Sequence, residues 1–315
     1  METPKTLLEA ITTFANPEIA HDFVKGLRWP NGVACPRHGC GSADVREIRG
    51  KRPRWYCREC KREFTAKVGT IFEDSPIGFD KWLPAMWLLS ANCNGISSME
   101  LHRALGVTQK TAWFMLHRIR LAMQEGHMER LSGEVEVDET YFGGAPRNRR
   151  PRIAVTRHGQ EPTEPIKTYE KTAVMGFRER GGRVRAFVIP NEKMLTLHLR
   201  LRDHVEPGST LYTDAHPGYT AAGYSYAHYV INHSLEYVRD HHVHTNNIEN
   251  FWSVLKRTIG GTYICPRPKH LDRYLDEQIF RFNERESTDG PRFVKAVKGA
   301  DSKRLTYKAL IRKKR

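Results

Sequence analysis

The sequence predicts an α/β protein in which a mixed sheet flanked by helices follows a small cysteine-held module and a helical region. Three observations support this order of parts. Four of the six cysteines lie in two close pairs between positions 35 and 60. Apolar residues then recur at helical spacing over residues 79–123. After Gly133 the pattern changes to alternating strands interrupted by helices.

The lack of a long apolar run predicts that the chain does not span a membrane, and the positive net charge favours a polyanionic partner. The chain has 315 residues, enough for roughly two or three domains. It lacks a run of about 18 apolar residues and the apolar stretch of a signal peptide. The net charge is +15, with 28% of residues charged and no basic amphipathic anchor for a membrane surface. A reducing cytoplasm, on the bacterial nucleoid, is the expected compartment because the paired cysteines are typical of metal binding.

The first seventy residues predict a helical segment followed by a zinc ribbon. Residues 1–30 are expected to be helical because Leu7, Ile11 and Phe14 recur on one face. Two cysteine pairs separated by a strand-like stretch follow over residues 31–70, which is the layout of a zinc ribbon. Four thiolates suit tetrahedral zinc, and so small a domain needs the metal to fold. The expected Zn²⁺ ligands are Cys35, Cys40, Cys57 and Cys60, with His38 as the alternative to Cys40 because the first pair is widely spaced.

Basic side chains surround the predicted ribbon and suit DNA phosphates. They are Arg46, Arg49, Lys51, Arg52, Arg54, Arg58, Lys61 and Arg62. Zinc ribbons also serve as protein contacts, so this surface has either of two expected partners.

Residues 71–130 predict a helix-turn-helix. Ser97 and Glu100 form a capping box that opens a short helix, and Gly106 ends it. Thr108 then caps a longer helix, and a short helix, a turn with glycine and a longer helix are typical of DNA-binding proteins. The side chains expected to point outward, toward a major groove, are Gln109, Lys110, Thr111, His117 and Arg118. The alternative is a helical hairpin with no role in DNA binding.

Residues 131–290 predict a ribonuclease H-like domain from the order of strands and helices. An alternating strand over 134–144 is followed, after a polar basic loop at 145–167, by a hairpin through Gly181 and Gly182. A helix at 193–203 comes next. The remaining elements are a strand that ends at Asp214, a strand near Tyr229–Asn232 and a helix that starts near Asn246.

Three carboxylates from distant parts of this domain are expected to meet. Asp138 lies on the first strand and Asp214 on the fourth, adjacent in the sheet, and Glu249 lies on the helix packed beside them. Together they would repel one another, and two Mg²⁺ ions about 3.5–4 Å apart would relieve that repulsion and serve phosphodiester chemistry. Taken singly, each Asp suits a strand end, and Asn246 with Glu249 suits a capping box. The helix itself has a buried stripe made of Ile248, Phe251, Trp252, Leu255 and Ile259.

The chain resembles insertion-sequence transposases of the DDE type, in the ISXO-like group, over roughly residues 20–290. The resemblance rests on the cysteine pairs with Phe64-Thr65 and Gly69-Thr70, on Val137 to Gly144, on Tyr212-Thr213-Asp214, and on His244 to Arg257. It implies that Asp138, Asp214 and Glu249 bind Mg²⁺ or Mn²⁺. It also implies that Lys256, seven residues past Glu249, contacts the transposon end, with Asn246 as an auxiliary ligand and Arg257 as a further DNA contact.

The expected function is that of a transposase which binds inverted terminal repeats and performs Mg²⁺-dependent cleavage and strand transfer. Its partners would be double-stranded DNA, both transposon ends and target, and the resemblance implies a homo-oligomer on paired ends. The loop at 145–168 and a basic tail at 291–315 would hold the DNA backbone. The alternatives are a structure-specific nuclease on the same fold and a non-catalytic DNA-binding regulator.

Overall fold

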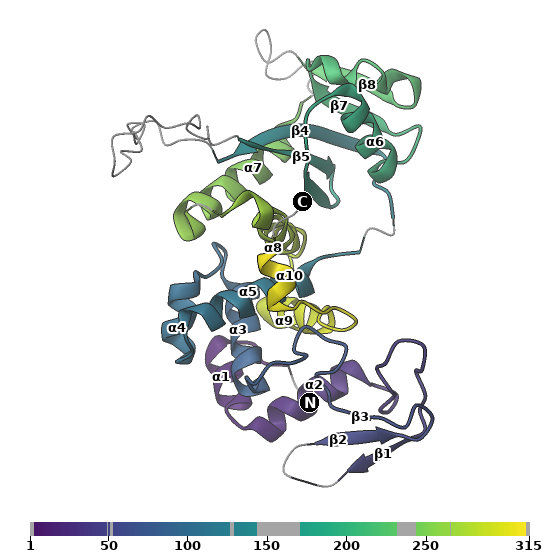
Figure 1. Ribbon diagram of the computed structural model, residues 1–315. Helices are drawn as coiled ribbons and strands as arrows, with labels where there is room; N and C mark the ends of the chain where they lie inside the picture. Colours follow the sequence, from purple (N-terminus) through teal and green to yellow (C-terminus); the bar gives the residue numbers. More distant parts are fainter. Residues whose placement is uncertain are drawn as a thin grey trace, which may run out of the picture. The chain divides into compact units, whose positions relative to one another are not determined.

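A computed structural model describes residues 3–48, 50, 53–126, 129–143, 171–231, 244–264 and 266–312 (Figure 1). The chain forms two compact units. The helical unit consists of Met1–Gly126 and Leu255–Arg315, and the sheet unit consists of His127–Val254. The expected basic loop at 145–168 lies outside the described residues, as do Arg49, Lys51 and Arg52 of the basic ribbon surface.

The helical unit begins with two short helices, α1 (Leu7–Phe14) and α2 (Pro17–Arg28). The Asn16 side chain accepts hydrogen bonds from the first turn of α2, and a proline occupies its first position, so both residues favour a helix start here. Phe14 and Phe23 are buried with ring centroids 4.9 Å apart. The helices predicted over residues 1–30 are therefore present.

The ribbon is a small antiparallel sheet of β1 (Val45–Ile48), β2 (Arg54–Cys57) and β3 (Glu63–Phe64), with β2 in the centre. Its inner face carries Trp55 and Phe64, which stack on each other and contact Trp29. Aromatic packing of this kind attaches the ribbon to the helices, because so small a sheet has little core of its own.

Three helices form the middle of the helical unit: α3 (Phe79–Ala91), α4 (Ser98–Leu105) and α5 (Gln109–Met123). The capping box predicted at Ser97 and Glu100 is formed in both directions. Gly106 has φ +61°, the left-handed conformation that ends a helix, and Thr108 accepts a hydrogen bond from the backbone N–H of Thr111. The helix, turn and helix predicted over residues 97–123 are therefore present at the expected positions.

The C-terminal segment, which includes most of the basic tail expected at 291–315, contains helices that pack into the helical unit. It contains the π-turn η3 (Ile259–Tyr263), the 3₁₀ turn η4 (Pro268–His270), α8 (Leu271–Asn283), α9 (Asp289–Lys298) and α10 (Tyr307–Ile311). Phe293 of α9 is fully buried, with its ring centroid 5.2 Å from Trp87 and 5.8 Å from Phe23. In the sequence of this segment, basic residues alternate with an apolar stripe at helical spacing, and the buried residues of that stripe include Phe293, Ala296 and Val297.

Among the described residues, the sheet unit is built on five strands in the order β6-β5-β4-β7-β8. Their bounds are Glu134–Phe142 for β4, Thr172–Glu179 for β5, Val184–Val188 for β6, Thr210–Asp214 for β7 and Ala227–Ile231 for β8. The pairs β4–β5 and β5–β6 are antiparallel, whereas β4–β7 and β7–β8 are parallel. This is the mixed sheet flanked by helices that the sequence predicts.

Helices cover both faces of this sheet. Val135 and Val137 of β4 pack in one cluster with Leu197 and Leu201 of α6 (Met194–His204), close to the 3₁₀ turns η1 (Pro217–Tyr219) and η2 (Ala222–Tyr224). The alternate residues of β4 face α7 (Asn246–Thr258), which begins in the sheet unit and ends in the helical unit. The predicted buried stripe is confirmed, because its four residues in α7 and Ile259 at the start of η3 are all at most 7% exposed.

Candidate functional site

Four thiols converge in the ribbon. The Sγ atoms of Cys35, Cys40, Cys57 and Cys60 all lie within 4.8 Å of one another. Two of the Sγ–Sγ distances, Cys35 to Cys60 and Cys40 to Cys57, are 3.7 Å. A tetrahedral site with Zn–S bonds of about 2.3 Å requires S–S edges of about 3.8 Å. The thiols therefore fit zinc, and Cys40 rather than His38 is the fourth member of the group.

Backbone amides favour the thiolate form of Cys57, whereas burial raises the pKa of the Cys35 thiol to about 12. The N–H of Cys60 donates to Cys57 and is the main cause that lowers the pKa of the Cys57 thiol to about 7. Zinc binds the thiolate and not the thiol, so a low pKa at this position assists metal binding near neutral pH.

In the sheet unit, the Glu136 carboxylate holds the start of α7. Glu136 is fully buried, and its Oε2 accepts hydrogen bonds from the backbone N–H groups of Asn247 at 2.9 Å and Ile248 at 3.1 Å. Its Oε1 accepts from Asn247 Nδ2 at 2.7 Å and from Arg180 Nε at 3.0 Å. A helix N-terminus carries N–H groups without acceptors and a partial positive charge. A carboxylate accepts hydrogen bonds from these N–H groups, and its negative charge is attracted to the positive end of the helix.

Glu249 does not cap α7 in the way that the alternative reading of the sequence expected. Asn246 is the first residue of the helix, and the Glu136 carboxylate on β4 accepts the hydrogen bonds from the backbone N–H groups at the helix start. The Glu249 side chain is exposed and accepts a hydrogen bond from Thr245 Oγ1 at 3.3 Å. The Glu249 carboxylate therefore contacts the residue that directly precedes α7.

A tryptophan on α7 contacts the first candidate aspartate. Trp252 Nε1 donates to Asp138 Oδ2 at 3.0 Å. The indole lies over Gly176, which pairs with Asp138 across the β4–β5 ladder. A Cβ atom at Gly176 would lie 2.4 Å from the Trp252 ring, closer than atoms can approach, so only glycine allows α7 to pack this near to the sheet.

The two candidate aspartates lie on neighbouring parallel strands. In the β4–β7 ladder, Glu134 pairs with Thr210 and Glu136 with Tyr212. Both pairs differ by 76 positions, as do Asp138 and Asp214, which follow two residues beyond the last paired residues of the two strands. Asp214 is the last residue of β7, and its Oδ1 accepts from the backbone N–H of His216 at 3.1 Å.

Electrostatics set Asp138 apart from ordinary surface carboxylates. Burial, helped by the charges of Asp214 and Glu249, raises the pKa of Asp138 to about 6, although hydrogen bonds from the backbone and from Trp252 oppose the shift. These charges therefore act on one another. Among the described residues, however, the thiols are the one group whose ligand atoms already lie as close as a metal requires.

A fourth acid, Glu139, lies next to Asp138 and was not singled out from the sequence. It accepts a hydrogen bond from the buried Tyr219 hydroxyl. Burial raises the pKa of Glu139 to about 8, and the charges of Asp138 and Asp214 add to the shift. Strand alternation directs Glu139 to the face of the sheet opposite Asp138. In the sequence, Glu139 could have been singled out because it directly follows Asp138 on a strand that also carries buried valines.

The residues predicted to contact DNA divide into two groups. Gln109 and Lys110 are exposed at the start of α5, and Thr111 is half-buried beside them. His117 and Arg118, also expected to point outward, are buried instead. The Arg118 Nε donates to the backbone oxygen of Leu305 at 3.0 Å, because this part of α5 packs against the C-terminal segment.

Lys256 and Arg257 are both exposed near the end of α7. Lys256 lies seven residues beyond Glu249, or about two turns along the same helix. Both side chains are thus accessible to a ligand.

Comparison with known proteins relates this arrangement to a family. Residues 130–283 match the ISXO2-like transposase domain, and residues 16–63 match the transposase zinc-ribbon domain. An uncharacterized transposase-like protein of Haemophilus influenzae is 35% identical over 105 residues, which cover 33% of this chain and 84% of the relative. The chain belongs to the ISXO2-like transposase family.

A second relative of this transposase family member is similar to it over most of the length of both chains. An uncharacterized protein in transposable element ISH50 of Halobacterium salinarum is 29% identical over 259 residues, covering 79% of this chain and 85% of the relative. The zinc-ribbon match contains all four converging cysteines, which supports Zn²⁺ as the bound metal. Family membership supports a transposase role and DNA as the partner. In the described part of the transposase chain, no helix has the length and apolar character needed to span a membrane.

Proposed function

We propose that this protein is a DNA transposase that binds inverted terminal repeats and performs divalent-metal-dependent cleavage and strand transfer. The observation that carries the proposal is the placement of Asp138 and Asp214 on adjacent parallel strands, with Glu249 on the helix that packs over them. The strand order with three antiparallel strands followed by two parallel ones supports the ribonuclease H-like fold expected for such an enzyme.

The acids suit Mg²⁺ or Mn²⁺. Asp138, Asp214 and Glu249 offer hard oxygen ligands, and the raised pKa of Asp138 reflects the burial and repulsion that a cation would relieve. When bound at such acids, Mg²⁺ activates the attacking oxygen and stabilises the leaving oxygen of a phosphodiester. Exposure of Glu249 leaves its carboxylate accessible to a metal.

The chain's own side chains would position these acids. The Trp252 indole donates to one oxygen of Asp138 and so would fix the orientation of this carboxylate. Glu136 fixes the start of α7 and so limits where Glu249 can lie. Lys256, exposed on the same helix, would neutralise a phosphate of the transposon end, and Arg257 would add a contact to the backbone.

Recognition of the ends would use the turn between α4 and α5. Gln109, Lys110 and Thr111 lie at the start of α5, where helix-turn-helix proteins contact base edges, and the zinc ribbon would add phosphate contacts. The net charge of +15 supports double-stranded DNA, both ends and target, as the partner. We further propose that the protein acts in the cytoplasm, on the nucleoid, as a homo-oligomer on paired ends.

A joining assay with a precut transposon end tests this function. Asp138→Asn and Asp214→Asn should each reduce strand transfer at least about 10³-fold, because a metal ligand is lost, while end binding changes less than about twofold. Asp203→Asn, at an exposed acid on α6, is the matched control and should remain active. Cleavage without joining by the wild type would indicate a nuclease, and binding without either reaction would indicate a regulator.

A further inference from the structure

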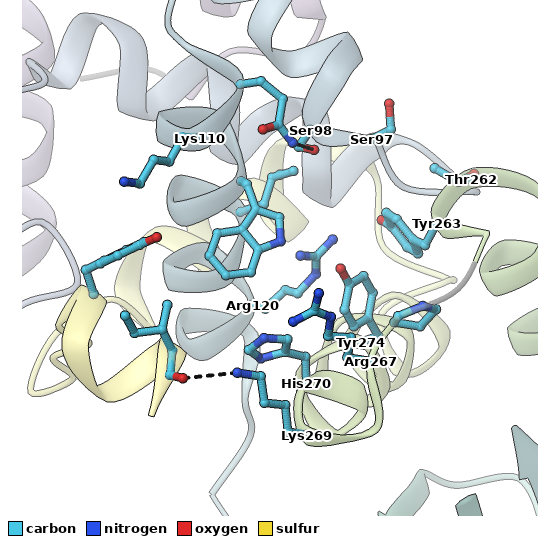
Figure 2. Close-up of a pocket in the computed structure, with 16 residues that line it drawn as sticks. Ser97, Ser98, Lys110, Arg120, Thr262, Tyr263, Arg267, Lys269, His270 and Tyr274 are labelled. Atoms are coloured by element: carbon cyan, nitrogen blue, oxygen red, sulfur yellow. Dashed lines mark hydrogen bonds between the residues drawn. The ribbon is translucent and has the colours of Figure 1, made fainter. Parts of the chain in front are cut away.

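The helical unit contains a cavity of about 620 Å³ that the proposed reaction does not use (Figure 2). One wall comes from α5, with Lys110 and Arg120, and another from the segment that runs from Thr262 to Tyr274. Its lining is aromatic and basic, comprising among others Trp113, Tyr263, Tyr274, Tyr307, Arg267 and Lys269. The described residues that line it include no carboxylate.

Arg120 lies among the aromatic side chains of this cavity with unused hydrogen-bonding capacity. Its side chain is 1% exposed, and its guanidinium carbon lies 4.0 Å from the Tyr274 ring centroid and 4.9 Å from that of Tyr263. Its Nε donates to Glu277 Oε2 at 2.6 Å, but its Nη1 and Nη2 have no hydrogen-bond acceptor among the described residues. Buried donors rarely lack an acceptor, so this guanidinium suits a ligand that brings one.

The surroundings also carry an excess of positive charge. Glu277 is fully buried and is shared by two guanidinium groups, those of Arg120 and Arg281. One carboxylate against two cations leaves a net positive charge in the interior. Burial, with neighbouring cations led by Lys269, lowers the pKa of His270 to about 4, so its ring is neutral near pH 7. The cavity therefore favours an anionic ligand with a flat aromatic part.

We propose that this cavity binds an unpaired DNA nucleotide, with its base stacked on Trp113 or a neighbouring tyrosine and its phosphate near Arg267 and Lys269. Base faces stack on aromatic side chains only where the base is not paired within a duplex, and arginine donors suit the acceptors on a base edge. The volume lies in the range of about 300–1,000 Å³ typical of small-molecule sites. Gln109 and Lys110 also line the cavity, so it opens beside the turn proposed to contact duplex DNA.

This inference rests on the proposed function, since both take DNA as the partner. The test measures fluorescence anisotropy of the full-length protein with a labelled single-stranded oligonucleotide and with a labelled terminal-repeat duplex. Trp113→Leu should weaken single-strand binding about tenfold, because one base–aromatic stack is lost, and Trp113→Phe should restore most of it. Neither change should alter duplex affinity more than about twofold.

A second variant decides the question if Trp113→Leu does not fold, as judged by its thermal melt. Arg267→Gln removes an exposed cation of the lining, and Lys298→Gln removes an exposed cation of α9 outside the cavity. Arg267→Gln should lower the salt dependence of single-strand binding by about 0.7 in log–log slope, whereas Lys298→Gln should leave it unchanged.

Two results would overturn the inference. In the first, neither Trp113→Leu nor Arg267→Gln changes the affinity for the single-stranded probe, while the protein still binds the duplex. In the second, Trp113→Leu lowers the affinities for the single-stranded and duplex probes equally. If the wild type binds neither probe, the proposed function fails together with the inference. The experiment therefore separates failure of the cavity from failure of DNA binding as a whole.

Discussion

The Glu136 carboxylate connects β4, β5 and α7 through a small number of buried hydrogen bonds. Arg180, at the end of β5, donates to it, and so do two backbone N–H groups at the start of α7. Hydrogen bonds to a charged group contribute about 1.5–3 kcal/mol each, and loss of the charge leaves the partly buried Arg180 guanidinium without its full partner. Glu134, two residues earlier on the strand, also pairs with Arg180 but is half-exposed.

We predict that Glu136→Gln lowers the free energy of unfolding of the sheet unit by about 2–4 kcal/mol, because the negative charge at the helix N-terminus is lost. Urea unfolding measures this change, and hydrogen exchange should report faster exchange in the first turn of α7. Glu134→Gln is the matched control and should cost less than about 1 kcal/mol, since exposed ion pairs contribute little. Equal stability of the two variants would contradict a capping role for Glu136.

The zinc ribbon illustrates how an element can depend on a ligand and on its neighbours together. Its three strands pair over short stretches, and Trp55 and Phe64 bury their rings against the preceding helices. The thiols at its base lie at distances that match a tetrahedral metal. Metal binding and aromatic packing therefore both stabilise the same small sheet.

We predict about one Zn²⁺ per chain in the wild type and a loss of most of it in Cys60→Ser, because a hydroxyl is a poor zinc ligand. Elemental analysis of the purified protein measures the stoichiometry, and a thermal melt should show a destabilised ribbon. Cys93→Ser, at an exposed cysteine outside the cluster, is the control. Zinc retained at the wild-type level in Cys60→Ser would exclude this ligand set.

The helical unit is assembled from the two ends of the chain, which meet in one core. Phe293 near the C-terminus contacts Phe14 and Phe23 near the N-terminus, with ring centroids 5.9 and 5.8 Å apart. Contacts between residues so far apart in sequence require nearly the whole chain to be present before the core is complete. The unit that contains the ribbon therefore depends on the last helices of the protein.

We predict that Phe293→Ala destabilises the helical unit by about 3–5 kcal/mol, because it leaves a cavity in a closely packed core. Chemical unfolding measures the change. Ile311→Ala, at a side chain that is 46% exposed, is the comparison and should cost less than about 1 kcal/mol. A cost for Phe293→Ala no larger than that of Ile311→Ala would show that the two ends do not share a core.

Local patterns predicted much of this structure because their physical causes are local. The capping box at Ser97 and Glu100 and the left-handed Gly106 involve residues a few positions apart, and both are observed. Strand alternation correctly separated Val137 from Asp138, and the expected pairing of the first and fourth strands is present. The spacing of cysteines likewise predicted the thiol group, with Cys40 as the expected fourth member and His38 as the alternative.

Long-range packing was beyond such patterns. Arg118 was expected to face DNA because its position on the helix allowed it, but the oxygen of Leu305 that it binds is 187 residues away. The apolar stripe around Phe293 was overlooked because basic residues surround it, and its partners lie near the other end of the chain. Glu136 similarly gained its role from Asn247 and Ile248, which no local pattern connects to it.

By itself, the sequence determined the order of the parts, the metal-binding thiols, the strand on which Asp138 lies and the family resemblance, because each depends on spacing along the chain. Only the tertiary structure decided which acid caps α7, which basic residues of α5 remain accessible and where the C-terminal helices pack. The physical reason is that burial and hydrogen bonding depend on which distant segments meet. The sequence specifies the chemical type of each side chain, but the packing of the core determines which other groups that side chain contacts.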